Sequence, residues 1–138
     1  MDLMRCIAVG YAIALLLAAL TNHIPGLTDA QGRAFGIFAL DIYDDMLHLA
    51  SAAWAAISAY WSRQASVNFL KLFGTLYFLD GLLGLATGSG YLDLGILFYG
   101  VQSLSLGFKI LANLPHLALG GFAIFAGFVL AKRPGFVA

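Results

Sequence analysis

The chain has 138 residues, of which 62% are hydrophobic and only 10% are charged, and its formal net charge is zero. Soluble globular domains carry about 25% charged residues, so this composition excludes an ordinary water-exposed surface. Seven basic against seven acidic residues also exclude the basic stripe of a nucleic-acid-binding protein, and the single cysteine, Cys6, excludes an internal disulfide.

The first apolar run, residues 3–22, predicts a membrane-spanning helix. A helix needs about 20 mostly apolar residues to cross the hydrocarbon core of a bilayer. Pro25 and Gly26 follow this run and mark its end. A cleaved signal peptide is the alternative, because Arg5 precedes the apolar centre, but the residues that follow lack the small-x-small cleavage pattern. We therefore expect the run to be retained as a span.

The second predicted span covers residues 45–62 and follows a connection at about residues 23–44. Within this connection Phe35, Phe38 and Ile42 recur at helical spacing. The stretch is too short to cross a membrane. It predicts a short amphipathic helix that lies at the membrane surface or re-enters it.

A polar turn at residues 62–66 is predicted to separate the second span from a third at residues 69–87, and a fourth span covers residues 111–131. The connection at residues 88–110 holds a second amphipathic stretch, for which we also expect an interfacial helix. Its apolar members are Leu94, Leu97, Phe98, Val101 and Leu104, and the expected headgroup-level anchors of the two connections are Tyr43, Tyr91 and Tyr99. The predicted fold is all-α: a single domain, residues 1–138, that forms an integral membrane four-helix bundle.

The chain also reads as two tandem two-span units, because a polar-x-x-His-Leu element opens both the second and the fourth span. The element covers residues 45–49 in the first unit, from Asp45 through His48 to a leucine. It covers residues 113–117 in the second unit, from Asn113 through His116 to a leucine. Two such units imply a pseudo-two-fold axis along the membrane normal. We expect Asp45 and Asn113 to cap their helices, with Pro115 in the first turn of the fourth span.

Basic residues predict that both termini are cytoplasmic. With four spans, the side that holds the termini carries Arg5, Arg63, Lys71, Lys132 and Arg133, whereas the opposite side carries Arg33 and Lys109.

Small-xxx-small pairs and clustered glycines indicate faces where helices approach closely, since packing and not a hydrophobic drive joins helices in lipid. These faces serve contacts within the chain, self-association or contacts with other membrane subunits, and the sequence leaves the three open. They comprise Ala52 with Ala56, Ala55 with Ala59, Ala123 with Gly127, Gly81 with Gly84, and Gly120 with Gly121.

Three histidines stand near the ends of predicted spans. His48 and His116 are expected to form hydrogen bonds with caps, connections or water, and His23 lies at the same level. In the alternative interpretation His48 and His116 face each other and bind a metal or a haem- or chlorophyll-type tetrapyrrole, since imidazole is a frequent ligand of both. No His-x-x-x-His or Glu-x-x-His motif accompanies them. We therefore expect no cofactor, with a tetrapyrrole as the alternative.

Asp80 lies inside the third predicted span. A carboxylate in hydrocarbon is costly, so it is by default a functional hypothesis. We expect it to act as structural glue, bonded to Tyr77, to a neighbouring helix or to a partner subunit. A proton or substrate pathway, as in a small transporter, is the alternative.

The repeated element, together with a Gly-rich amphipathic stretch and the third-span glycines, resembles a bacterial family of four-helix membrane proteins of unknown function. The residues that carry the resemblance are Gly36-Ile37-Phe38-Ala39, Asp45-Met46-Leu47-His48-Leu49, Phe73-Gly74-Thr75-Leu76-Tyr77, Gly81-Leu82-Leu83-Gly84-Leu85 and Asn113-Leu114-Pro115-His116-Leu117. The resemblance implies this fold and a bacterial inner-membrane location but no reaction, and Asp80 departs from the family's usual apolar residue. We expect a non-enzymatic accessory or structural subunit of a membrane complex.

Overall fold

A computed structural model describes residues 1–134 of the chain, and the regular structure of these residues is helical, without a strand. The prediction of an all-α fold is therefore confirmed. The elements in chain order are α1 (Leu3–Thr21), α2 (Ile42–Trp61), α3 (Arg63–Thr87), α4 (Gly95–Tyr99), α5 (Leu106–Phe128) and the 3-10 turn η1 (Leu130–Lys132).

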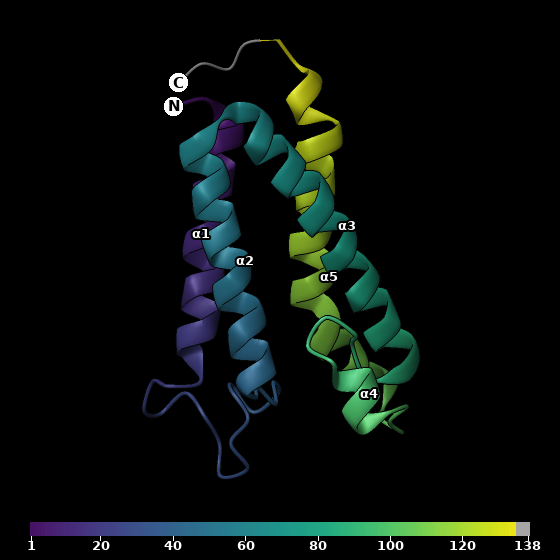
Figure 1. Ribbon diagram of the computed structural model, residues 1–138. Helices are drawn as coiled ribbons and strands as arrows, with labels where there is room; N and C mark the ends of the chain where they lie inside the picture. Colours follow the sequence, from purple (N-terminus) through teal and green to yellow (C-terminus); the bar gives the residue numbers. More distant parts are fainter. Residues whose placement is uncertain (135–138) are drawn as a thin grey trace.

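The four long helices form two helical hairpins (Figure 1). The first hairpin pairs α1 with α2, and the second pairs α3 with α5. The N-terminus, the α2–α3 junction and η1 lie at one end, which we call the terminal end. The connections at residues 22–41 and 88–105 lie at the opposite end, which we call the loop end. Each hairpin thus has a long connection between its two helices.

Three helical segments are long and apolar enough to cross a membrane: α1, α3 and the continuous segment Leu106–Lys132 that combines α5 with η1. They correspond to the first, third and fourth predicted spans. The second span is not among them, although α2 forms as a helix of 20 residues, and its first turn carries Asp44 and Asp45. The prediction of four membrane crossings is therefore supported for three helices, and the crossing of α2 stays a prediction.

The first hairpin begins each of its helices with an aspartate cap. The Asp2 carboxylate accepts hydrogen bonds from the amides of Met4 and Arg5, at 3.0 and 3.2 Å. For α2, Asp41 and Asp44 form a reciprocal capping box. The prediction that Asp45 caps α2 is therefore wrong: the helix begins three residues earlier than the predicted span, because the Asp41–Asp44 pair already satisfies its first amides.

A single residue, Ser62, joins α2 to α3. Its backbone is extended, its amide continues α2 by bonding to Ser58, and its hydroxyl caps α3 by accepting from the amide of Ala65 at 3.0 Å. The predicted polar turn at residues 62–66 is therefore wrong beyond its first residue. Ser66, expected in that turn, is buried in α3 and donates its hydroxyl proton to the carbonyl of Ser58 at 3.2 Å.

The last long helix also begins earlier than the sequence predicts. Ser105 caps α5, so Asn113 and Pro115 lie inside the helix and not at its start. The predictions of an Asn113 cap and of Pro115 in the first turn are wrong. The Asn113 side-chain amide donates to the carbonyl of Lys109 at 2.8 Å, one turn earlier. Pro115 lacks an amide proton, so α5 loses one helical hydrogen bond at this point.

The two connections differ from the predicted interfacial helices. The first contains no helix: Phe35 and Gly36 have φ angles of 53° and 72°, in the left-handed region that interrupts a right-handed helix. Isolated bridges pair Ala34 with Thr28 and with Phe38. In the second connection only α4, five residues long, is helical, so the predicted stretch is helical over part of its length.

The core consists of aromatic and small residues. Phe69, Phe73 and Tyr77 stack along α3, with ring centroids 5.1 and 4.4 Å apart, and Tyr11 of α1 meets Phe69 and Phe73 edge-on. Glycines bring α3 and α5 into close contact. A Cβ atom at Gly74 would lie 2.7 Å from the backbone nitrogen of Ile124. Most of the small residues predicted to mark close helix contacts are buried, namely Ala52, Ala55, Ala59, Gly81, Gly84, Gly120, Ala123 and Gly127, whereas Ala56 is exposed and Gly121 is half-buried.

Candidate functional site

The best-defined polar site is built around Asp80, which lies two turns before the end of α3 and is only 2% exposed. Its carboxylate accepts a hydrogen bond from Nδ1 of His116 at 2.6 Å. It also accepts from the backbone amides of Tyr91 and Leu92, at 2.7 and 2.9 Å. Three donors from α5 and from the 88–105 connection therefore converge on one buried carboxylate.

This arrangement fits one of the roles expected of Asp80. The neighbouring helix supplies a partner through His116, whereas the Tyr77 hydroxyl has no hydrogen-bond partner among the described residues. Hydrogen bonds from an imidazole and two amides satisfy a carboxylate that would otherwise be costly to bury. Asp80 thus fixes the connection onto the second hairpin. The two amide donors could not be foreseen from residue type, because they belong to the backbone of a connection.

His48 and His116, the predicted pair, both line a small pocket between the hairpins. The pocket has a volume of about 170 Å³, and Tyr77 lines it as well. The rings of Tyr77 and His116 lie 4.4 Å apart between centroids. Nδ1 of His48 is buried and has no hydrogen-bond partner among the described residues. The structure therefore brings both imidazoles to one pocket, although they belong to different hairpins.

The hydrogen bond to Asp80 sets the chemistry of His116. Because the carboxylate accepts from Nδ1, the proton of a neutral ring resides there and Nε2 is left as an acceptor. Ligating histidines are commonly oriented by such a carboxylate. However, the described residues contain no group of three or more His, Cys, Asp or Glu side chains that could hold a metal ion. Sites for drug-sized ligands usually measure about 300–1,000 Å³, so the shared pocket is small for a tetrapyrrole, whose binding stays a prediction.

The other predicted polar residues lie outside this pocket. Nε2 of His23 lies 2.8 Å from Oδ2 of Asp45, and the His23 side chain is 64% exposed. This contact fastens the start of the 22–41 connection to the first turn of α2. Asn113 instead lines a larger cavity at the loop end. The structure thus separates His23, Asp45 and Asn113 from the His48–His116 pocket.

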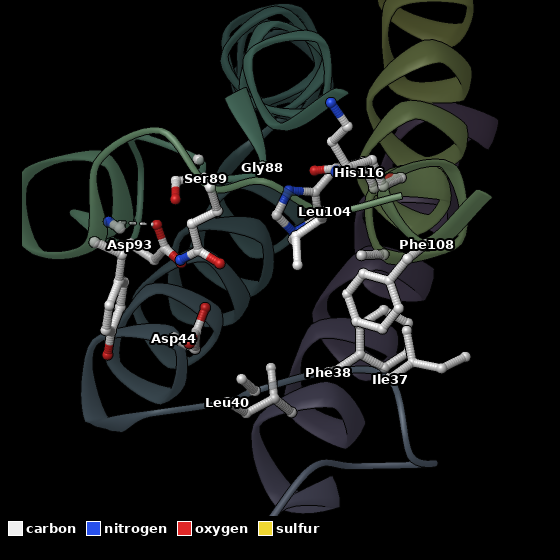
Figure 2. Close-up of a pocket in the computed structure, with 18 of the residues that line it drawn as sticks. Ile37, Phe38, Leu40, Asp44, Gly88, Ser89, Asp93, Leu104, Phe108 and His116 are labelled. Atoms are coloured by element: carbon white, nitrogen blue, oxygen red, sulfur yellow. Dashed lines mark hydrogen bonds between the residues drawn. The ribbon is translucent and has the colours of Figure 1, made fainter. Parts of the chain in front are cut away.

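The larger cavity measures about 410 Å³ and is more polar (Figure 2). Asp44 borders it from the first hairpin, and Asp93 and His116 border it from the second. The hydroxyl of Ser89 is buried beside it without a partner among the described residues. Sequence reasoning did not single out Ser89 or Asp93, because neither stands in a motif and only the folded connection places them there.

Contacts from α4 close the loop end between the hairpins. The Tyr99 hydroxyl donates to Oδ2 of Asp41 at 3.3 Å, and the rings of Tyr43 and Phe98 stack with centroids 5.2 Å apart. The Asp41 carboxylate raises the pKa of Tyr99, since a nearby negative charge opposes loss of the phenol proton. Tyr91 donates its hydroxyl proton to the carbonyl of Leu76 at 2.7 Å. All three predicted tyrosine anchors are therefore engaged in contacts within the chain.

The geometry therefore places one buried carboxylate–imidazole pair and two pockets at the loop end of the molecule. Whether the chain belongs to the bacterial four-helix family that it resembles stays a prediction. Comparison with protein-family models, with curated proteins and with solved structures found no match.

Proposed function

We propose that the chain is a four-span integral protein of the bacterial inner membrane, with both termini in the cytoplasm, and that it is a non-enzymatic accessory or structural subunit of a membrane complex. The observation that carries this proposal is the outward apolar surface of all four long helices. Leu17 of α1 and Ile57 of α2 are each 58% exposed, Leu72 of α3 is 57% exposed, and Phe125 of α5 is 45% exposed. Large apolar side chains that are exposed in this way are accommodated by lipid or by the apolar surface of another protein.

The packing of the first hairpin supports a crossing by α2. At the terminal end, the Arg5 guanidinium donates to the carbonyls of Ala59 and Tyr60, at 2.6 and 3.1 Å. At the loop end, His23 contacts Asp45 at 2.8 Å. The antiparallel α2 therefore runs alongside α1 over its whole length. If α1 crosses the bilayer in this arrangement, α2 has to cross with it.

The polar site supports a structural role over catalysis or transport. Asp80 is engaged by three donors that hold α5 and the 88–105 connection in place. A carboxylate that already accepts three hydrogen bonds is poorly suited to relay protons or to bind a substrate. The small-residue faces are largely buried between helices of this chain, so a partner would meet the large apolar side chains instead.

Photo-crosslinking in native membranes tests the subunit proposal. A photoreactive phenylalanine analogue is placed in turn at Leu17, Ile57, Leu72 and Phe125, one exposed position on each long helix. A subunit is expected to give a discrete protein adduct from at least one helix, while the positions that face lipid give none. Gln31 in the exposed first connection is the control position.

Lipid adducts alone from all four helix positions would contradict the subunit role. They would leave the membrane location intact, because lipid crosslinking itself requires that these positions lie in the bilayer.

A further inference from the structure

The charged side chains are divided unevenly between the two ends of the molecule (Figure 1). Among the described residues, the only carboxylate side chain at the terminal end is that of Asp2, which already caps α1. Five of the seven basic side chains lie toward that end, and none of the five forms an ion pair within the described residues. They are Arg5, Arg63, Lys71, Lys132 and Arg133. The terminal end therefore carries a strong excess of positive charge.

Lys71 stands out among these residues because it lies within a helix that is apolar enough to cross a membrane. It follows Arg63 by eight residues, so its Cα lies about 12 Å deeper along α3. Its Nζ lies over the ring of Phe128, 5.0 Å from the centroid, and Phe128 is 43% exposed. Because helical side chains lean toward the N-terminus of their helix, we expect the Lys71 ammonium to reach upward to the headgroup level. A lysine at this depth is costly unless its charge meets an anion there.

The seam along which α3 packs against α5 and η1 brings further cations to the same end. Nη2 of Arg63 donates to the carbonyl of Ala131 at 2.7 Å, which fastens the start of α3 to η1. A guanidinium has five N–H donors, so most of those of Arg63 remain available. Lys132 and Arg133 follow Ala131 directly and are exposed. Lys71 thus lies below a group of exposed cations, and neither α5 nor η1 contains an acidic residue.

The surroundings of this seam limit the kind of anion that it can bind. Leu72 and Phe125, on the two helices of the seam, are 57% and 45% exposed and offer an apolar surface below the cations. An anionic phospholipid matches both features, because its phosphate is charged and its acyl chains are apolar. A zwitterionic phospholipid matches them less well, since its own cationic group offsets the charge of its phosphate.

We propose that the terminal end of the α3–α5 seam binds an anionic phospholipid, whose phosphate lies between Lys71 below and Arg63 and Lys132 above. Its acyl chains lie along the exposed apolar side chains of α3 and α5. This assignment rests on the proposed membrane location. With both termini in the cytoplasm, the lipid belongs to the cytoplasmic leaflet, whose negative surface potential attracts basic segments.

Native mass spectrometry of the purified full chain in a neutral detergent tests this site. The chain is mixed with phosphatidylglycerol and phosphatidylcholine that carry the same acyl chains, and the fraction of protein that retains each lipid is measured. Phosphatidylglycerol is expected to be retained in preference. Lys71→Gln is expected to lower this preference about fivefold, the effect of one basic residue at an anionic membrane surface. Lys71→Arg is expected to preserve the preference, because it keeps the charge.

Lys109→Gln is the matched control, because it removes the same charge from a half-buried lysine in the first turn of α5, at the loop end. It is expected to leave the preference for phosphatidylglycerol unchanged. An equal loss in Lys109→Gln and Lys71→Gln would show that only the net charge matters and would overturn the site.

Equal retention of the two lipids, or a Lys71→Gln variant that keeps the full preference, would overturn the lipid site and leave the membrane location intact. Displacement of phosphatidylglycerol by inorganic phosphate would assign the cations to a soluble anion and overturn the site as well. A chain that stays folded and monodisperse without detergent would instead contradict the membrane location itself, and the lipid site with it. If Lys71→Gln does not fold, the comparison of the two lipids and the phosphate competition on the unmodified chain decide the question.

Discussion

At the scale of single residues, the Asp80 carboxylate accepts the hydrogen bonds that hold the loop end of the second hairpin together. Its three donors come from two elements, the amides of Tyr91 and Leu92 in the connection and Nδ1 of His116 in α5. If the carboxylate is removed, all three donors, which are partly buried, lose their partner. Removing one partner destabilises the fold by more than the intact hydrogen bonds stabilise it, because the remaining donors keep their desolvation penalty without a partner.

Replacing Asp80 by Ala is expected to destabilise the protein by about 2–4 kcal/mol, and Asp80→Asn by less, because the amide oxygen still accepts from the backbone. The measurement is the thermal unfolding midpoint in one detergent. Thr75→Ala, at an exposed position of the same helix, is the control and is expected to change stability by about 0.5 kcal/mol or less. An Asp80→Ala midpoint equal to that of the control would show that the three hydrogen bonds do not support the fold.

The residues of this site were only partly predictable from the sequence. Asp80 and His116 stand out because an ionisable group in an apolar run needs a partner, and their types and helices make a pair plausible. The amides of Tyr91 and Leu92 carry no such signal. Asn113 misled the sequence analysis because a good capping residue marks a helix start only where no better cap precedes it, and Ser105 precedes it.

At the scale of elements, glycines set the distance between α3 and α5. A Cβ atom at Gly120 would fall on the backbone of Phe78, and one at Gly74 would fall 2.8 Å from Cβ of Ala123. Real Cβ atoms do not approach so closely, so a methyl group at either position forces the two helices apart. Close approach of this kind is the main source of helix association in lipid.

Gly120→Ala is therefore expected to lower the unfolding midpoint, with a cost in the range of overpacked cores, about 1–3 kcal/mol. Gly107→Ala is the matched control in the same helix, because no atom lies within 4 Å of the added Cβ there. The control is expected to be neutral or to stabilise α5 by up to about 1 kcal/mol, since Ala favours a helix over Gly. A Gly120→Ala variant as stable as the Gly107→Ala variant would show that α3 and α5 are not held at this distance.

The first connection is organised by Asp29, whose carboxylate accepts from the amides of Gln31 and Arg33 and from the Arg33 guanidinium, at 2.9, 2.8 and 3.0 Å. The amide of Arg33, followed by the other two donors, lowers the pKa of Asp29 below its ordinary value of 3.8. A depressed pKa means that the contribution to order is complete above 3.8 and is lost as the pH falls through the lower, folded-state value.

We expect the amide proton shifts of Gln31 and Arg33 to stay constant above about pH 5 and to move together as the pH falls below 3.8. Nuclear magnetic resonance in detergent measures this titration, and Asp29→Asn is expected to abolish it. A midpoint above 3.8 would contradict the hydrogen-bonded arrangement of this connection.

Hydropathy predicted the long helices better than the connections. Long runs of apolar residues specify α1, α3 and α5, and α5 continues through Pro115 with the loss of one helical hydrogen bond. In the first connection, the helical spacing of Phe35, Phe38 and Ile42 misled the prediction, because two consecutive left-handed residues interrupt the backbone there. Periodicity records which side chains are apolar, whereas the loop geometry depends on contacts with distant residues.

At the scale of the whole molecule, the two hairpins share one covalent junction, the core contacts of Tyr11 with Phe69 and Phe73, and a set of contacts at the loop end. Ser62 joins them at the terminal end, and the Tyr99–Asp41 hydrogen bond and the Tyr43–Phe98 stack join them at the loop end. Both pockets lie at the loop end, with walls from both hairpins. The relative position of the hairpins therefore determines the shape of each pocket.

The same arrangement makes a prediction about membrane sidedness. Cys6 is replaced by Ser, and single cysteines are introduced at Gln31, Gln64 and Val101, which are exposed in the first connection, at the start of α3 and in the second connection. If all four long helices cross, a membrane-impermeant thiol reagent added to intact cells is expected to label positions 31 and 101 but not 64. Opening the cells is expected to expose position 64, because the proposed topology places it with the termini in the cytoplasm. Labelling of positions 31 and 64 from the same side would mean that α2 does not cross, and the first hairpin could then not enter the bilayer as the two-helix unit that its Arg5 and His23 contacts define.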